Sequence, residues 1–189
     1  MYDAMEFEIE GVTPTICHNG QTCDPLNRFA KAIKEISGKR KKSDKDYEDM
    51  ARLEWEAGFY FDKDMKPCWP GQNIKRMILD AAKKSKEGPL AKTGVIVSGL
   101  FPILYQGPKD VEGMWNDDNF RIAAKVKVQQ SSVIRTRPIF PEWRLKFTVM
   151  TNSEIVNKNQ VKQWITTAGQ IIGLSDWRPD YGQFSVVSK

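Results

Sequence analysis

A run of alternating residues in the last third of the chain sets the first limit on the fold. The apolar side chains Trp143, Leu145, Phe147 and Val149 alternate with Arg144, Lys146 and Thr148. Because successive side chains of a strand point to opposite faces, this run predicts a strand with one buried and one charged face. Residues 5–12 alternate in the same way, with glutamates on the polar side. Two half-buried strands require a sheet whose apolar face is covered by other elements.

Apolar residues at helical spacing predict helices that could cover this apolar sheet face. The three clearest stripes are Leu26, Phe29, Ile33 and Ile36; Ile74, Met77, Ile78 and Ala81; and Val161, Trp164, Ile165 and Ala168. We expect the first of these helices to begin at Asp24-Pro25 with Asp24 as its cap, and the last to be capped by Asn157. Ser43 predicts the start of a further helix that runs to about Trp55. The middle stripe should start after Pro70-Gly71 and stop before Gly88-Pro89.

The order of these elements predicts the fold class. Short strands are expected at residues 58–61, 95–105 and 183–187, and a long extended region covers residues 122–151. Without its insertions the order is β-α-β-β-α-β, which is the ferredoxin-like or RNA-recognition-like arrangement of the α+β class. We therefore predict a single domain over residues 1–189, with a helical insertion at about 26–56 and an extended, hairpin-like insertion at about 106–141.

Composition favours a cytoplasmic protein with no membrane partner. No apolar run approaches the roughly 20 residues needed to cross a bilayer, and the first residues lack a basic and an apolar signal region. The three cysteines, Cys17, Cys23 and Cys68, are odd in number and form no CxxC pair, which indicates reduced thiols. Cys17, His18 and Cys23 could supply three metal ligands but lack a fourth nearby, so no metal site is expected.

Catalytic chemistry has little support in the sequence. His18 is the only histidine, and its neighbour Cys17 points away from it on an extended chain, so a structural or surface role is expected. No glycine spacing matches a phosphate-binding or dinucleotide-binding loop. We therefore expect a non-enzymatic protein with no catalytic residue and no cofactor. A metal-dependent ribonuclease that uses Asp24 remains an alternative, although capping explains Asp24 more simply.

Positive charge is concentrated in separate segments. Residues 26–45 hold eight basic and two acidic side chains, residues 121–146 hold seven and one, and residues 72–86 hold five and one. Acidic residues dominate elsewhere, with seven acids against two bases over residues 46–64. Such segregation favours a face that binds a polyanion, although solvated helix faces give the same pattern.

Candidate nucleic-acid contacts combine these charges with backbone amides and aromatic rings. They are Lys39, Arg40, Lys41, Lys42, Gln72, Asn73, Lys75, Arg76, Arg135, Arg137, Trp177, Arg178 and Tyr181. Lysine and arginine neutralise phosphates, and the helix start at Pro70-Gly71 offers free backbone N–H groups to one of them. Trp69, Trp177 and Tyr181 lie in expected loops, where their rings could stack on bases or pack locally.

Two motifs resemble those of a known family. The strand followed by Pro70-Gly71-Gln72-Asn73-Ile74-Lys75-Arg76 is similar to the "PGxxhK" helix entry of the RAMP (repeat-associated mysterious protein) superfamily, which forms CRISPR effector backbones. The segment from Gly173 to Phe184 looks like that superfamily's glycine-rich loop, although it has only two glycines. Residues 136–143 also resemble uncharacterised phage and prophage proteins of similar length.

The resemblance implies a phage-type protein that binds single-stranded RNA or DNA in the host cytoplasm. It places Lys75, Arg76 and the loop 173–182 near the ligand, and the insertions as elements that grip the strand or a neighbouring subunit. Partners would be the strand, further copies of the chain or a nucleoprotein complex. An alternative of a different class is a protein-interaction module that mimics or inserts into a CRISPR-type complex as an inhibitor.

Overall fold

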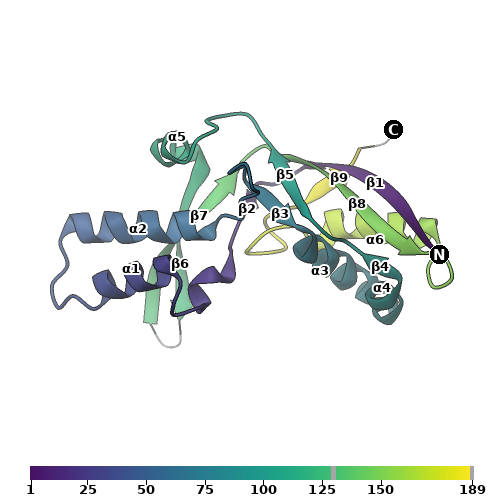
Figure 1. The fold of residues 1–189 in the computed structure, drawn as a ribbon, viewed down its shortest axis with the longest axis horizontal. Coiled ribbons are helices and arrows are strands. Elements are labelled where there is room, and N and C mark those ends of the chain that lie inside the picture. The colour runs from purple at the N-terminus through teal and green to yellow at the C-terminus, as the bar shows by residue number, and fades with distance from the viewer. Residues whose placement is uncertain (129–130, 188–189) are drawn as a thin grey trace. The chain divides into compact units, whose positions relative to one another are not determined.

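The computed structural model describes residues 1–128 and 131–187 and contains two compact units. Unit 1 comprises Met1–Ile16, Phe61–Gln106 and Pro141–Lys189, whereas unit 2 comprises Cys17–Tyr60 and Gly107–Phe140. Figure 1 shows helices and antiparallel strands in both units. The chain is therefore a mixed α+β protein, as its alternating and helical patterns predicted.

The strands of unit 1 form a sheet around two long central strands. They are β1 (Tyr2–Gly11), β3 (Cys68–Pro70), β4 (Val95–Ile96), β5 (Leu100–Leu104), β8 (Arg144–Asn152) and β9 (Phe184–Val186), whereas β2 (Thr15–Ile16) lies outside this sheet. The sheet order is β3-β5-β8-β1-β9, and β4 also pairs with β8. All of these pairings are antiparallel.

The register of β1 and β8 explains the alternation in their sequences. Phe7 lies opposite Phe147, and the two rings stack with their centroids 5.6 Å apart on the buried face. One residue along, Glu8 lies opposite Lys146, and their charged groups form an ion pair of 3.2 Å. Apolar pairs thus build the core while opposite charges stabilise the other face of the same two strands.

The helices of unit 1 are α3 (Gly71–Ala82), η2 (Lys83–Ser85), α4 (Gly88–Gly94) and α6 (Lys158–Ile171). Of these, α3 and α6 contribute most of the buried helical residues. The apolar stripes of α3 and α6 are buried, and the two helices contact each other. A Cβ atom on Gly169 would lie 2.2 Å from the carbonyl oxygen of Phe184, so α6 approaches β9 closely at a glycine. Asn157 caps α6, as predicted, and the structure adds a capping box with Gln160.

Unit 2 combines a helix pair with a strand pair. Its elements are η1 (Gly20–Cys23), α1 (Arg28–Ser37), α2 (Asp44–Gly58), α5 (Val111–Asn116), η3 (Asp118–Phe120), β6 (Arg121–Val128) and β7 (Ser131–Phe140). α2 contacts both α1 and β7, and β6 pairs with β7. Trp55 of α2 is fully buried, and its indole N–H donates to the carbonyl of Phe120 at 2.8 Å. The rings of Phe59 and Trp115 lie edge-on to it.

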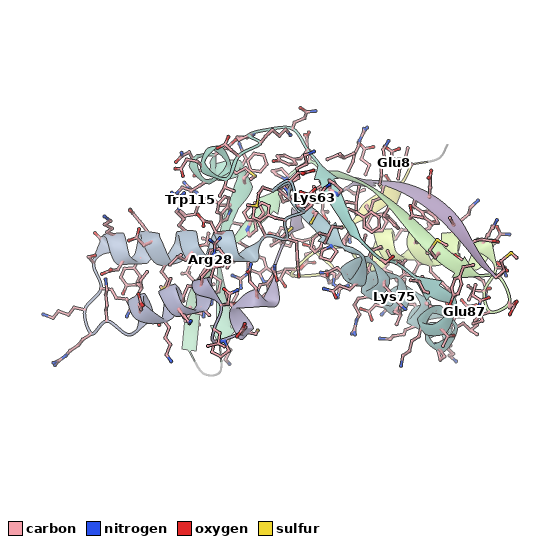
Figure 2. The ribbon with its side chains drawn as sticks, viewed as in Figure 1. Glu8, Arg28, Lys63, Lys75, Glu87 and Trp115 are labelled. Carbon is pink, nitrogen blue, oxygen red and sulfur yellow. The ribbon has the colours of Figure 1, made fainter. Side chains whose placement is uncertain are left out.

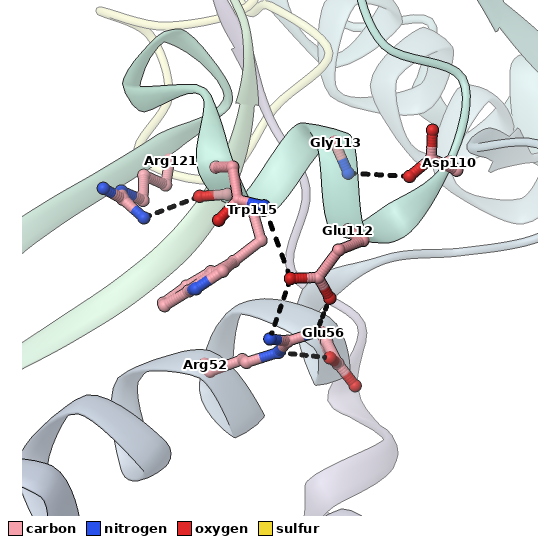
Figure 3. Close-up of polar contacts among 8 residues, drawn as sticks. Arg52, Glu56, Asp110, Glu112, Gly113, Trp115 and Arg121 are labelled. Atoms are coloured by element: carbon pink, nitrogen blue, oxygen red, sulfur yellow. Dashed lines mark hydrogen bonds and ion pairs between the residues drawn. The ribbon is translucent and has the colours of Figure 1, made fainter.

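A network of charges around Trp115 fixes α5 to α2 (Figure 3). Arg52 on α2 forms an ion pair with Glu112 on α5, and this hydrogen bond raises the pKa of the Arg52 guanidinium and lowers the pKa of Glu112. The guanidinium of Arg121 donates to the Trp115 carbonyl at 2.6 Å and lies 4.9 Å from the centre of its ring. Arg52 and Arg121 therefore make contacts that stabilise the structure of unit 2.

One helix start and one strand differ from the sequence predictions. Asn27 caps α1 by accepting from Phe29 N–H, because Asp24 is occupied three residues earlier in a turn, where it accepts from Leu26 N–H at 2.9 Å. The short strand predicted over residues 58–61 is wrong: α2 continues to Gly58, and only an isolated bridge from Phe61 follows.

The strand predicted over residues 95–105 is split. Gly99 has a φ of +107°, which interrupts the extended backbone between β4 and β5. Gly88 and Pro89, which we expected to separate two elements, begin α4, because proline is compatible with a first helical turn.

The described residues contain neither a membrane-spanning helix nor a cluster of metal ligands. No helix there has the length and apolarity needed to span a bilayer. No group of three or more His, Cys, Asp or Glu side chains lies close enough in that part of the chain to hold a metal ion. Cys17 and Cys68 are both buried, and burial raises the pKa of the Cys68 thiol to about 11.

Candidate nucleic-acid interface

The loop between α6 and β9 is closed on itself by backbone hydrogen bonds. Leu174 N–H donates to the carbonyl of Gly182 at 2.8 Å, and Gly182 N–H donates to the carbonyl of Pro14 at 2.8 Å. At the start of the loop, Gly173 N–H still reaches the carbonyl of Ala168, which ends the helix. Both ends of the loop are therefore anchored in unit 1.

Glycine is required at both anchors. Gly173 and Gly182 have φ angles of +83° and +78°. A Cβ atom on Gly182 would lie 2.5 Å from the carbonyl oxygen of Leu174, and one on Gly173 would lie 2.6 Å from that of Tyr181. Left-handed backbone together with such close contacts excludes larger residues without rearrangement.

The segment just before unit 2 holds the middle of the loop. Asp176 N–H donates to the Ile16 carbonyl at 2.8 Å, and the Ser175 hydroxyl accepts from Ile16 N–H at 2.8 Å. The Thr15 hydroxyl, which is fully buried, donates to the Leu174 carbonyl. Residues 174–176 are thus fixed in place, and the side chains that follow project from a rigid base.

Trp177 and Tyr181 pack against each other at the exposed part of the loop. Their ring centroids are 6.1 Å apart at an interplanar angle of 69°, and both side chains are half-buried. Trp177 has a φ of +53°, a conformation that is uncommon for a residue with a bulky side chain. Of the two roles considered for these rings, local packing is therefore present. Each side chain is also partly exposed.

Three cations converge on one carboxylate beside this loop. Asp80 of α3 accepts from Arg76 at 3.0 Å and from Lys83 at 2.9 Å, and Arg178 of the loop lies 3.6 Å away. Partial burial would raise the pKa of Asp80, but the hydrogen bonds and charges of Lys83 and Arg76 outweigh it and hold that pKa below its usual value. Arg76 and Arg178, which are far apart in the sequence, therefore meet at Asp80.

An open groove of about 830 Å³ lies over this cluster. Its lining consists of Asp80, Lys83, Lys84, Ile171, Ile172, Ser175, Asp176, Trp177, Arg178 and Pro179. The charged members are three cations and two carboxylates, and Ile171 and Ile172 add apolar surface at the end of α6. The groove thus presents positive charge, apolar surface and one indole ring together.

The start of α3 differs from the expected phosphate site. Gly71 N–H donates to the carbonyl of Gly99 at 2.8 Å, and a Cβ atom on Gly71 would lie 2.6 Å from the carbonyl oxygen of Val97. The expectation of a free backbone N–H is therefore wrong for Gly71, because the backbone of residues 97–99 occupies its hydrogen-bonding direction. Trp69 is also buried, in β3.

The other predicted residues of α3 remain on its outer side. Gln72 and Arg76 are exposed, while Asn73 and Lys75 are half-buried. Figure 2 labels Lys75 on this helix. Arg76 is linked to the loop through Asp80, which it shares with Arg178.

The basic run of residues 39–42 connects α1 to α2, and its first lysine contacts the start of α2. Lys39 forms an ion pair with Asp46, and the Lys42 ammonium donates to the Lys39 carbonyl at 3.0 Å. The hydrogen bond from Lys39 and those from Ser43 lower the pKa of Asp46 to about 2. Arg40 and Lys41 are exposed, and within residues 1–128 and 131–187 they form no ion pair.

Arg135 and Arg137 lie on the same side of β7, as the sequence predicted, and line one pocket. Arg135 forms an ion pair with Glu54 of α2, whose side chain is buried. One guanidinium nitrogen of Arg137 lies 3.3 Å from Nε2 of His18. Arg135 thus forms a partly structural ion pair with Glu54, and no sequence pattern predicted this contact.

The groove contains residues that sequence reasoning did not select. Asp80, Lys83 and Lys84 were not among the candidate contacts. The spacing of Arg76, Asp80 and Lys83, at i, i+4 and i+7, was a usable signal, because residues three and four apart are neighbours on a helix surface. Nothing in the sequence indicated that Arg178 would join them.

Comparisons with known proteins show a fold likeness without a sequence family. No family model matches the chain, and no curated protein matches it. The chain aligns with one from the cryo-EM structure of Type III-B Cmr-beta bound to cognate target RNA, with a TM-score of 0.54 and 13% identity over 99% of its length. It spans 59% of that longer chain.

A crystal structure of Cmr6 from Pyrococcus furiosus aligns over 99% of both chains, with a TM-score of 0.38 and 10% identity. The likeness to Cmr-beta is one of fold, and it supports the RAMP-like fold that the two sequence motifs predicted.

Proposed function

We propose that this chain is a non-enzymatic, RAMP-like protein that binds single-stranded RNA and works within a nucleoprotein complex. The structural neighbour Cmr-beta is bound to target RNA, which is the reason to favour RNA over DNA. The groove of unit 1 is the proposed path of the strand. Arg40 and Lys41 of unit 2 provide further phosphate contacts. Phage origin and binding by a row of copies stay predictions from the sequence.

The proposal includes a ferredoxin-like core in unit 1. The strands β1, β5, β8 and β9 follow one another in the order expected for strands one to four of β-α-β-β-α-β, with α3 and α6 as the two connecting helices. The spatial order β9-β1-β8-β5, all antiparallel, supports this assignment. The two segments of unit 2 would then be insertions into one RAMP-like domain.

The observation that carries the proposed function is the convergence of Arg76, Lys83 and Arg178 on Asp80 beside Trp177. Three cations around one carboxylate leave an excess of two positive charges at the edge of the groove. A phosphodiester can accept hydrogen bonds from these donors, while the exposed part of the Trp177 ring can stack on a base. Charge and ring together suit a single strand, because a duplex keeps the faces of its bases covered.

Fluorescence anisotropy of labelled oligonucleotides across a salt series tests this proposal. With three to five phosphates neutralised, we expect log K for single-stranded RNA to fall against log salt with a slope of about −2 to −3.5. Single-stranded RNA should bind more tightly than a duplex of the same length. Absence of binding by any oligonucleotide at low salt would remove the proposal.

A protein-interaction module is the second candidate, favoured by the sheet of unit 1. Ile96, Leu100 and Leu104 are 40%, 48% and 44% exposed. The registers of β4 and β5 with β8 place Ile96 and Leu104 on the same face as Met150 and Arg144. Exposed apolar side chains gathered on one face are typical of contact surfaces. A chain that ignores oligonucleotides yet co-purifies with complex subunits would support this candidate instead.

A further inference from the structure

One side of β1 has no neighbouring strand along much of its length. β8 pairs with residues 2–10 of β1, whereas β9, on the other side, pairs with residues 9–11. Beyond these pairs, the N–H of Val187 donates to the Glu8 carbonyl at 2.8 Å. Among residues 1–128 and 131–187, no strand pairs with residues 2–7 on the β9 side. We call this stretch the open edge of β1.

The open edge presents backbone donors and acceptors at alternate residues. Because Glu8 directs its carbonyl toward β9, the alternation of the strand directs the N–H and C=O groups of Glu6 and Ala4 to the same side. The register with β8 is continuous over residues 2–10, so no bulge turns these groups away. Residues 2–7 also contain no lysine or proline, the residues with which proteins commonly protect a sheet edge.

A groove of about 1120 Å³ lies beside this edge. Its lining includes residues 6–8 of β1, residues 183–187 at β9 and exposed residues of α6. Phe7, Phe147 and Phe184 supply apolar surface within it. A strand added to the open edge directs every second side chain to the same side as Phe7, where this apolar surface lies.

The charge of β1 selects the chemistry of the partner. β1 carries four carboxylates and no basic residue. Three of the four form ion pairs within unit 1, which are Asp3 with Lys158, Glu8 with Lys146 and Glu10 with Arg144. Glu6 is exposed and forms no ion pair among the described residues. A basic residue opposite Glu6 is therefore favourable, whereas a second copy of β1 brings two acidic edges together.

We propose that the open edge of β1 binds an extended segment of a partner protein, which joins the sheet as an antiparallel strand in the direction of β9. The segment alternates basic and apolar residues: a lysine or arginine lies opposite Glu6, and the apolar side chains on either side face the groove. Backbone hydrogen bonds supply affinity, and the alternation supplies specificity. The groove beside the open edge shares no lining residue with the proposed RNA groove, so the two surfaces are separate.

Fluorescence anisotropy of the full chain with a fluorescein-labelled peptide, VKVKFKVKV, tests the inference without nucleic acid. In an antiparallel pair, the residue opposite Glu6 directs its own N–H toward β1, so the lysine amides of the peptide make the hydrogen bonds. N-methylation of the lysine amides should weaken binding by about tenfold or more. N-methylation of the valine and phenylalanine amides, which face away from β1, is the matched control and should have a much smaller effect.

Two variants of the chain test the edge itself. Ala4→Pro removes an N–H that faces the open edge and leaves the hydrogen bonds to β8 in place, so peptide binding should weaken by about tenfold or more. Glu6→Lys should weaken it by about three- to tenfold and should bind the peptide VEVEFEVEV more tightly than the parent does. Glu142→Lys, an exposed residue of unit 1 outside the groove lining, makes the same charge change and should leave peptide affinity unchanged. Circular dichroism checks that the variants fold.

The inference is overturned if VKVKFKVKV does not bind, if N-methylation of its lysine amides has no effect, or if Ala4→Pro binds it as the parent does. Sedimentation of the chain alone examines the other occupant: a dimer that Ala4→Pro dissociates would assign the edge to a second copy and would also overturn the inference. Lys83→Gln/Arg178→Gln should leave peptide affinity unchanged, so a failure of the RNA proposal is distinguishable from a failure here.

Discussion

The double variant Lys83→Gln/Arg178→Gln is expected to bind single-stranded RNA roughly ten- to a hundredfold more weakly than the parent at low salt. Both side chains line the groove of unit 1 and approach Asp80 from different segments. Without them, Arg76 is the one ion-pair partner of Asp80 left among the described residues, and the local excess of positive charge is lost. Anisotropy titrations of one labelled strand measure the change, and the slope against salt should become shallower by about one unit or more.

The control for this variant is Lys63→Gln/Lys92→Gln. Both lysines are exposed residues of unit 1 outside the groove lining, and Lys63 is labelled in Figure 2. The control removes the same net charge. An RNA affinity within about twofold of the parent would therefore show that the loss in Lys83→Gln/Arg178→Gln depends on where those two charges lie. An equal loss of RNA affinity in the two double variants would mean that binding depends only on the overall charge of the chain.

Trp55→Ala should lower the free energy of unfolding of unit 2 by about 3–5 kcal/mol. The indole is fully buried, contacts the rings of Phe59 and Trp115 edge-on, and donates a hydrogen bond to Phe120. Its removal leaves a cavity between α2 and η3 and takes away the hydrogen bond to the Phe120 carbonyl. Urea unfolding followed by far-UV circular dichroism should show a clearly lower midpoint.

Tyr47→Ala provides the matched control on the same helix. The Tyr47 side chain is 55% exposed, so its truncation should change stability by less than about 0.5 kcal/mol. A Trp55→Ala variant as stable as the Tyr47→Ala variant would contradict the place of Trp55 at the centre of unit 2.

The regular elements of unit 1 were largely predictable from local pattern. Alternation in residues 143–149 predicted β8 and its buried face, and Asn157 predicted the start of α6. These signals work because burial on a sheet or helix face repeats with the period of the backbone. The start of α1 was misplaced because Asp24 and Asn27 both suit a cap, and the choice between them depends on a turn that local propensity does not fix.

The candidate site was only partly predictable. The loop 173–184 and the helix start at residues 70–76 stood out through their glycines, aromatic rings and charges. Sequence could not show that Arg76 and Arg178 share Asp80, because that contact depends on how the loop is anchored to residues 14–16. Nor could it show that Arg135 pairs with Glu54, since 81 positions separate the two residues.

Ultraviolet cross-linking of single-stranded RNA to the parent chain, followed by peptide mass spectrometry, tests the central claim most directly. Aromatic rings that contact bases are the expected cross-linking positions, so the proposed path over the groove predicts linked peptides that contain Trp177 or Tyr181. Lys83→Gln/Arg178→Gln should reduce their yield. Cross-links confined to the charged face of β1 and β8, with none between residues 173 and 182, would contradict the proposed path of the strand.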